Sequence, residues 1–199
     1  MTRYVLASAS PRRRALLEQA GLSFAILPAQ GEELITKENP VQIVEELSYQ
    51  KAVEVAGRYQ GYHKNDTTVI IGADTIVALG NEIMGKPKDH ADAARMLTKL
   101  QGHTHQVYTG VTLAVTEGRL EKPAPVIYTF HEKTDVCMYP MTPEQIAAYV
   151  ATGEPVDKAG AYAIQGRCAI YIKEIHGEYN NVVGLPVARL MQELIARNL

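Results

Sequence analysis

Hydrophobic residues fall along the chain in two patterns: short continuous or alternating runs, and longer stretches in which apolar residues recur every three or four positions. The short runs predict strands, because successive side chains of a strand point to opposite faces. We expect strands at residues 4–7, 23–27, 67–74, 75–79, 105–115, 126–138 and 168–175. Gly80 and Asn81 predict a turn after 75–79, and Glu117 and Gly118 lie near a turn that would join the two longest runs as a hairpin.

The helical repeat appears in five stretches. They cover residues 11–20, 40–56, 90–101, 143–152 and 186–197. Ser10, Asp89 and Thr142 are good N-caps, and Pro11 suits the first helical position because its missing N–H has no partner there. Glycine follows three of the stretches, at residues 21, 57 and 102, as is typical of helix ends.

This order of about seven strands and five helices, with at least one hairpin, predicts a mixed β-sheet covered by helices. The fold class is therefore α/β. A length of 199 residues, of which 46% are hydrophobic and 21% charged, fits one ordered domain over residues 1–199. The sequence contains no repeat, linker or low-complexity segment.

The composition excludes several classes of protein. A net charge of −2 offers no overall basic field for a long nucleic acid. Cys137 and Cys168 are the only cysteines, with no metal-like spacing, so we expect reduced thiols in the core. No apolar run approaches the roughly 20 residues of a membrane span, and the first residues lack the shape of a signal peptide. We therefore expect a soluble cytoplasmic protein.

Three consecutive arginines, Arg12 to Arg14, fall in the first turn of the first expected helix. Cations are disfavoured there, because a helix N-terminus is the positive end of the dipole. The same N-terminus is an anion site, and guanidinium groups bind phosphate through paired hydrogen bonds, so a polyphosphate would relieve the repulsion. Taken alone, the segment fits three solvated arginines equally well.

Asp74 follows the apolar run 69–73, so it lies where a buried strand emerges. In open α/β sheets, ligands bind just beyond the carboxyl ends of strands. Gly72 also leaves room for a close backbone approach. A carboxylate at this position can bind a hard cation or accept a proton from water, and it can also simply cap a turn.

Two lysines could extend such a site towards phosphate. Lys51 interrupts the apolar helix face formed by Val44, Leu47 and Val55, where it would either snorkel past the core or point into a cleft. Lys86 lies in a Gly-Lys-Pro segment, in which the proline limits where the lysine can point.

Acidic and imidazole side chains are candidate metal ligands. Glu32 and Glu33 lie in the polar connection after the second expected strand, where they are either solvated or complete a magnesium site with Asp74. His103 and His105 fall on the same side of an extended segment. With no third ligand nearby, we expect them on a surface strand face.

Residues 153–166, GEPVDKAGAYAIQG, form a stretch that is polar, glycine-rich and long for a connection. Binding loops have this composition, although a plain loop can have it too. Gln165 is of interest because an amide can both donate to and accept from the edge of a base. The phosphate motif GxxxxGK[ST] and the dinucleotide motif GxGxxG are both absent from the sequence.

Seven short motifs occur in the order that is typical of one family. They are LASASPRRRALL, SYQKA around Lys51, GADTIV, GKP, TGV at 109–111, GEPVDKAGAYAIQG and NVVGLP at 181–186. Together they resemble the Maf family, also described as septum-formation-inhibitor-like proteins, which contains nucleoside triphosphate pyrophosphatases. The resemblance covers nearly the whole chain. Ala15 departs from the glutamate that is common there in the family and leaves the arginines intact.

The resemblance implies a fold like that of the inosine triphosphate pyrophosphatases, with an elongated mixed sheet and a deep cleft between two lobes. It also implies an enzyme, a hydrolase that cleaves a nucleoside triphosphate between the α- and β-phosphates with a divalent cation, Mg²⁺ or Mn²⁺. The products would be a monophosphate and pyrophosphate. The residues at the specificity positions are similar to those of the branch that acts on dTTP and UTP.

The resemblance further implies roles for individual residues. Asp74 matches the proton acceptor, and Glu33 would be an additional metal contact. Base choice is associated with the positions of Arg12, Thr75 and Gln165. The triphosphate path would be lined by Ser8, Arg13, Lys51 and Lys86. Of the three arginines, Arg14 is the one that we expect to face solvent, a division that does not come from the resemblance.

Two alternatives stay open from the sequence. The chain could bind nucleotides without hydrolysing them, as a regulator of septum formation or cell division. It could also be a pyrophosphatase for a modified pyrimidine or another modified nucleotide. A homodimer would be usual for a soluble protein of this kind.

Overall fold

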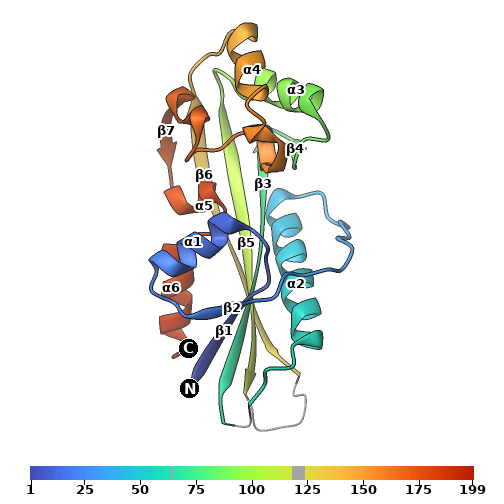
Figure 1. The fold of residues 1–199 in the computed structure, drawn as a ribbon, viewed down its shortest axis with the longest axis vertical. Coiled ribbons are helices and arrows are strands. Elements are labelled where there is room, and N and C mark those ends of the chain that lie inside the picture. The colour runs from blue at the N-terminus through green and yellow to red at the C-terminus, as the bar shows by residue number, and fades with distance from the viewer. Residues whose placement is uncertain (64, 118–123) are drawn as a thin grey trace. The chain divides into compact units, whose positions relative to one another are not determined.

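The computed structural model describes residues 1–63, 65–117 and 124–199, and the chain forms two compact units from interleaved segments. The first unit comprises Met1–Asp74, Thr109–Glu132 and Gly184–Leu199, and the second comprises Thr75–Tyr108 and Lys133–Val183. Three long strands run through both sets of segments, so the interleaving follows from the path of the sheet (Figure 1).

Within the described residues, the sheet has seven strands in the order β2-β1-β3-β5-β6-β7, with β4 paired to β3. The strands are β1 Thr2–Leu6, β2 Phe24–Ile26, β3 Thr67–Leu79, β4 Glu82–Met84, β5 Thr104–Glu117, β6 Val126–Met138 and β7 Ile172–His176. The pairs β1–β2 and β1–β3 are parallel, whereas β3–β4 and β6–β7 are antiparallel. The expected mixed α/β sheet is thus confirmed. The turn expected at Gly118 lies outside the described residues.

All five expected helices are present. The α-helices are α1 Pro11–Gln19, α2 Pro40–Arg58, α3 His90–Leu100, α4 Pro143–Val150, α5 Tyr179–Val183 and α6 Val187–Ala196. The sequence patterns do not predict α5, which has only five residues. The N-caps Ser10, Asp89 and Thr142 each accept a hydrogen bond from a main-chain N–H of the first turn, which stabilises these helix starts.

Several expected boundaries differ from the structure, and two of the differences have a clear physical reason. The expected strand at 168–175 begins only at Ile172, because Arg167–Tyr171 form a 3₁₀ helix, η3. Only Cys168 of that apolar run is buried, while Ile170 is 75% exposed, so the run does not form a strand face against the core. The second helix passes Gly57 and ends at Arg58, whose guanidinium pairs with Glu54 one turn earlier.

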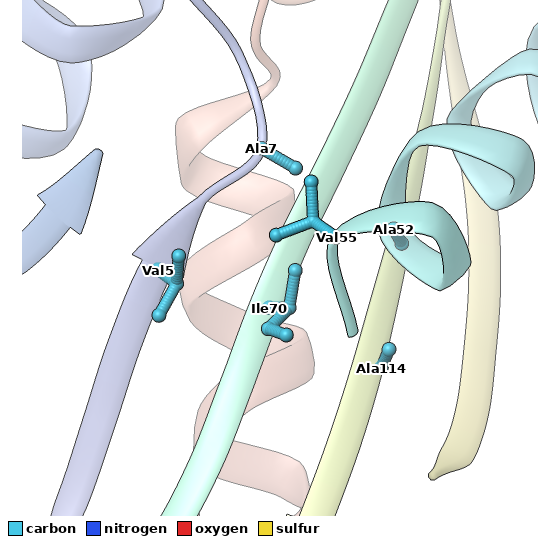
Figure 2. Close-up of a cluster of buried hydrophobic side chains, with 6 residues drawn as sticks. All are labelled: Val5, Ala7, Ala52, Val55, Ile70 and Ala114. Carbon is cyan, nitrogen blue, oxygen red and sulfur yellow. The ribbon is translucent and has the colours of Figure 1, made fainter. Parts of the chain in front are cut away.

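The core of the first unit lies between its strands and α2. Figure 2 shows Val5 of β1, Ile70 of β3 and Ala114 of β5 beside Val55 of α2, all of them buried. Full burial of a side chain such as Ile70 stabilises the fold by about 1.5–3 kcal/mol. Helices α1 and α6 lie on the other side of these strands from α2 (Figure 1).

Two glycines let α2 approach the sheet closely. A Cβ atom at Gly72 would overlap the Ser48 carbonyl oxygen and lie 2.8 Å from the Ala52 nitrogen, and one at Gly110 would overlap the main chain of Val44. The sheet therefore offers backbone rather than side chain where α2 rests. A buried hydrogen bond of 2.9 Å between the Ser48 and Thr112 hydroxyls joins the same surfaces.

The second unit has a buried polar pair that the sequence does not predict. His105 is fully buried, and its Nε2 is 2.8 Å from the Tyr162 hydroxyl, so the expected surface position is wrong for this residue. His103 is exposed and precedes β5. The alternation of the segment places His105 on its inner face, whereas His103 lies outside the strand.

No helix in the described ranges is long and apolar enough to cross a membrane.

Candidate active site

Asp74 lies just beyond the place where two parallel strands stop pairing. The pairing of β1 with β3 ends at Leu6 and Ile71, and the strand β3 continues through Asp74 to Leu79. Residues 69–73 are fully buried, and the Asp74 side chain is 13% exposed. The carboxylate therefore emerges at the carboxyl end of a parallel pair, which is where α/β proteins place ligands.

Lys51 of α2 reaches this carboxylate. Its Nζ is 2.5 Å from Asp74 Oδ1 and 3.0 Å from Glu33 Oε1, and its side chain is 15% exposed. The Lys51 ammonium therefore pairs with two carboxylates and does not simply extend past the core into solvent. Because Gly72 lowers the turn 48–52 onto β3, the lysine is close enough to make the contact.

Glu33 is brought to Lys51 by a loop that is fastened to α2. The Gln50 side chain binds both main-chain groups of Leu34, accepting from its N–H at 3.0 Å and donating to its carbonyl at 2.6 Å. Glu46 accepts from the main-chain N–H of Thr36 at 2.9 Å and from its hydroxyl at 2.6 Å. The loop thus follows α2 through Gln50, which belongs to the SYQKA motif but was not assigned a role from the sequence, and through Glu46, which lies outside the motifs.

Arg13 is held by main-chain and hydroxyl groups on both sides. Its Nε donates to the Gly184 carbonyl at 2.8 Å, and one terminal nitrogen donates to Ser8 Oγ at 3.2 Å. Burial lowers the pKa of the Arg13 guanidinium; Asp74 and Glu33 oppose this shift, while Arg12 adds to it. These electrostatic effects show that the guanidinium lies in the field of both carboxylates.

The three arginines differ in their surroundings. Arg12 and Arg13 are half-buried, whereas Arg14 is exposed and pairs with Glu18 at 2.8 Å on the outside of α1. The hydrogen bond to Glu18 raises the pKa of the Arg14 guanidinium. The expectation that Arg14 faces solvent is confirmed. The N-cap Ser10 accepts from the Arg13 N–H, so the arginines do occupy the first turn of a helix.

The remaining candidate residues belong to the second unit. Thr75 follows Asp74 directly on β3 and is half-buried. Lys86 is exposed between Gly85, whose carbonyl accepts from the Gly160 N–H at 3.1 Å, and the buried Pro87. Gln165 is exposed in a turn after the 3₁₀ helices η1 Glu154–Asp157 and η2 Ala159–Ala161.

Six of the expected site residues belong to the first unit, Arg12 among them, and the other five are joined by hydrogen bonds, by ion pairs or by the effect of the carboxylates on the Arg13 guanidinium. They are Ser8, Arg13, Glu33, Lys51 and Asp74. Sequence reasoning missed the Gly184 carbonyl that orients Arg13. The NVVGLP motif that contains this glycine was the available signal, but a main-chain acceptor carries no mark of its own in a sequence. Glu32 is exposed in the loop beside Glu33.

The carboxylates of Asp74 and Glu33 form a donor set that suits a magnesium ion only in part. Asp74 Oδ1 and Glu33 Oε1 both form ion pairs with the Lys51 ammonium. Among the described residues, no cluster of three or more His, Cys, Asp or Glu side chains is arranged to hold a metal ion. Mg²⁺ commonly takes one or two carboxylates and completes its shell with water and substrate phosphates, so the two residues fit that role.

The fold and the site define a mixed α/β protein whose acidic and basic side chains meet at the carboxyl end of a parallel strand pair. Residues 3–197 match the family described as Maf-like protein, and the chain belongs to this family.

Similar proteins of two bacteria carry the same name. A protein of Agathobacter rectalis named dTTP/UTP pyrophosphatase is 55% identical over 203 residues, which cover 98% of this chain and 97% of that protein. A dTTP/UTP pyrophosphatase of Bacillus cytotoxicus is 45% identical over 195 residues, covering 98% of this chain and 95% of the other. The match in each case spans both units.

Among solved structures, a HAM1 protein from Coxiella burnetii is similar at a TM-score of 0.46 and 16% identity. The similarity covers 98% of this chain and 100% of that one. At this TM-score the similarity adds nothing to the description of the site.

Proposed function

We propose that the protein is a nucleoside triphosphate pyrophosphatase that hydrolyses dTTP and UTP to the monophosphate and pyrophosphate. The observation that carries the proposal is the contact of Lys51 with Asp74 and Glu33 beside the half-buried guanidinium of Arg13. The names of the relatives at 55% and 45% identity supply the substrate class.

The basic side chains bind the triphosphate. Arg13 has its Nε on the Gly184 carbonyl and is oriented before substrate arrives. Lys51 is held by two carboxylates. Charge accumulates on the leaving pyrophosphate as the bond breaks, and cations fixed beforehand stabilise that charge without reorganisation. Ser8 supports Arg13. Lys86 is the remaining side chain proposed to bind phosphate.

Asp74 accepts the proton of the attacking water. The water oxygen bonds to the α-phosphorus, the bond from that phosphorus to the bridging oxygen breaks, and pyrophosphate leaves with the electron pair. Lys51 holds the Asp74 carboxylate in place at 2.5 Å. A positioned carboxylate typically contributes about 10²- to 10⁴-fold to such a step.

Asp74 and Glu33 are the residues that would hold a divalent cation, Mg²⁺ or Mn²⁺, together with the phosphates. When bound, the cation neutralises phosphate charge and acidifies water. Lys51 lies between the two carboxylates, so it keeps them from repelling one another until the metal and the substrate bind.

Base choice belongs to Arg12, Thr75 and Gln165. Gln165 is exposed, so its amide is accessible to the edge of a pyrimidine. A site that pairs with the polar edge of a base rejects a base that leaves its groups unpaired. The cytoplasmic location, the homodimer and the single domain with its cleft stay predictions from the sequence.

A panel of nucleoside triphosphates tests the proposed function. The protein is incubated with dTTP, UTP, the other common triphosphates and modified pyrimidine triphosphates in the presence of Mg²⁺ or Mn²⁺, and both products are measured. We expect pyrophosphate and monophosphate in equal amounts, with dTTP and UTP preferred. Release of orthophosphate and a diphosphate would overturn the proposal. Tight binding with no turnover would favour the regulator of cell division instead.

A further inference from the structure

Gln165 sits at the tip of a short turn in the second unit. The Gly166 N–H donates to the Ala163 carbonyl at 3.1 Å, which closes the turn. Ile164 and Cys168 on either side are buried, whereas Gln165 is exposed. The buried side chains of Ile164 and Cys168 therefore hold the turn against the core, while the Gln165 amide is exposed to solvent.

Two side chains hold this turn from both ends. The Tyr149 hydroxyl accepts from the Ala163 N–H at 3.1 Å and donates to Glu154 Oε1 at 2.8 Å. The second carboxylate oxygen, Glu154 Oε2, accepts from the Arg167 N–H at 3.1 Å. We call Tyr149 and Glu154 the clamp. It binds the main chain two residues before and two residues after Gln165.

The clamp is built into the interior. Tyr149 is only 4% exposed, and burial raises the pKa of its hydroxyl, so the group stays protonated and donates to the carboxylate. A Cβ atom at Gly166 would overlap the Glu154 carboxylate. Gly166 has a φ of −105°, so its missing side chain leaves room for the Glu154 carboxylate and does not serve a left-handed backbone.

We propose that Tyr149 and Glu154 are positioning residues that fix the Gln165 turn for recognition of the base, and that they thereby set the preference for pyrimidine nucleotides. The inference rests on the proposed function, because it assumes that Gln165 contacts the base. An amide discriminates between bases only when its orientation is held to about 0.5 Å and 10–20°. A loosened turn would therefore weaken discrimination before it weakens the chemistry at Asp74.

The test is Tyr149→Phe, which removes one oxygen and keeps the ring. Loss of a buried hydrogen bond corresponds to roughly a 3- to 10-fold effect. We expect the ratio of kcat/KM for dTTP to that for dATP to fall by this factor, through KM, with kcat for dTTP changed by less than about 2-fold. Amide hydrogen exchange at 163–167 should accelerate in the same variant, and this second measurement does not depend on activity.

Tyr162→Phe is the matched control. It also removes a buried hydroxyl of the second unit, but that hydroxyl binds His105. We expect it to leave the ratio unchanged. A double-mutant cycle then separates positioning from general loosening: in a Gln165→Ala background, Tyr149→Phe should not lower the ratio further, because the side chain through which it acts is gone.

Two further variants keep the test informative if Tyr149→Phe does not fold. Glu154→Gln keeps an acceptor and should shift the ratio in the same direction by less, and Gly166→Ala should displace the carboxylate and act like Tyr149→Phe. An unchanged ratio in folded variants, with turnover intact, would overturn the inference and leave the proposed function standing. Absence of pyrophosphate release by the unmodified protein would overturn the proposed function and with it the inference.

Discussion

Lys51 shows how one residue can carry most of the information about a site. A lysine on the apolar face of a helix is usually there for its aliphatic stem. Here its ammonium lies 2.5 Å from Asp74 and 3.0 Å from Glu33 at 15% exposure. Two carboxylates and one ammonium leave a formal charge of −1, so the half-buried guanidinium of Arg13, which lies in the field of both carboxylates, is needed to offset it before a phosphate binds.

Asp74→Asn should abolish most turnover and leave the fold intact. Asparagine keeps the size of the side chain but cannot accept the proton, so we expect kcat for dTTP to fall by about 10²- to 10⁴-fold. Asp66→Asn is the matched control, since Asp66 is 15% exposed and paired with Arg3 at 2.6 Å. A similar loss in both variants, or a full rate in Asp74→Asn, would remove Asp74 from the mechanism.

Replacing each of the three arginines by alanine should have a different effect on the kinetics. Arg13→Ala should raise KM for dTTP by about 10-fold or more, because a charge-assisted hydrogen bond to phosphate is lost. Arg12→Ala should alter the ranking of bases. Arg14→Ala should change KM by less than about 2-fold, since its exposed pair with Glu18 contributes little. Steady-state kinetics of the three variants measures these changes in KM and base preference. Equal effects of all three substitutions would contradict the different roles proposed for the arginines.

At the scale of elements, the sequence predicts what is local and misses what is set by distant partners. Helix α3 could be predicted closely, because its cap Asp89 and its apolar stripe are local signals. The structure of the segment 168–175 could not be predicted in this way, because the burial of Ile170 depends on which distant residues pack against it. For the site, charged residues stand out in a sequence, whereas the Gly184 carbonyl that orients Arg13 does not.

The loop that carries Glu33 is an element without secondary structure, and its order depends on α2. Gln50→Ala removes both hydrogen bonds to the Leu34 main chain. We expect faster amide exchange at residues 31–36 and an apparent metal affinity lowered about 3- to 10-fold, because Glu33 is no longer held near Lys51.

The control for this prediction is Gln42→Ala, at an exposed position of the same helix. Amide exchange followed by mass spectrometry and a titration of activity with Mg²⁺ provide the two measurements. If Gln50→Ala and Gln42→Ala behave alike, the Gln50 contact does not order the loop.

For the molecule as a whole, the buried His105 links stability to pH. Burial lowers its pKa from 6.5 to about 4, and Asp135 partly opposes the shift. The Nδ1 atom of His105 finds no hydrogen-bond partner among the described residues, which agrees with a neutral ring that is not stabilised as a cation. Below pH 6.5 the unfolded chain therefore takes up a proton that the folded chain does not.

The free energy of unfolding should consequently decrease as the pH falls from 6.5 towards 4. From pH 6.5 to 5 we expect a loss of about 1.6 kcal/mol from this residue. Urea unfolding at several pH values measures it. His105→Gln should flatten the dependence in this window, while His103→Gln, at an exposed position, should keep it. A slope that survives in His105→Gln would assign it to another group.

Gly72 ties the stability of the first unit to its chemistry. Its missing side chain is the space in which the turn of α2 around Ser48 and Ala52 rests, and Lys51 belongs to that turn. A single added methyl group would lift the helix and withdraw the ammonium from Asp74, two residues further along β3. The tolerance of this position to mutation is thus decided by catalysis and packing together, so a selection for activity and a selection for folding would both retain glycine there.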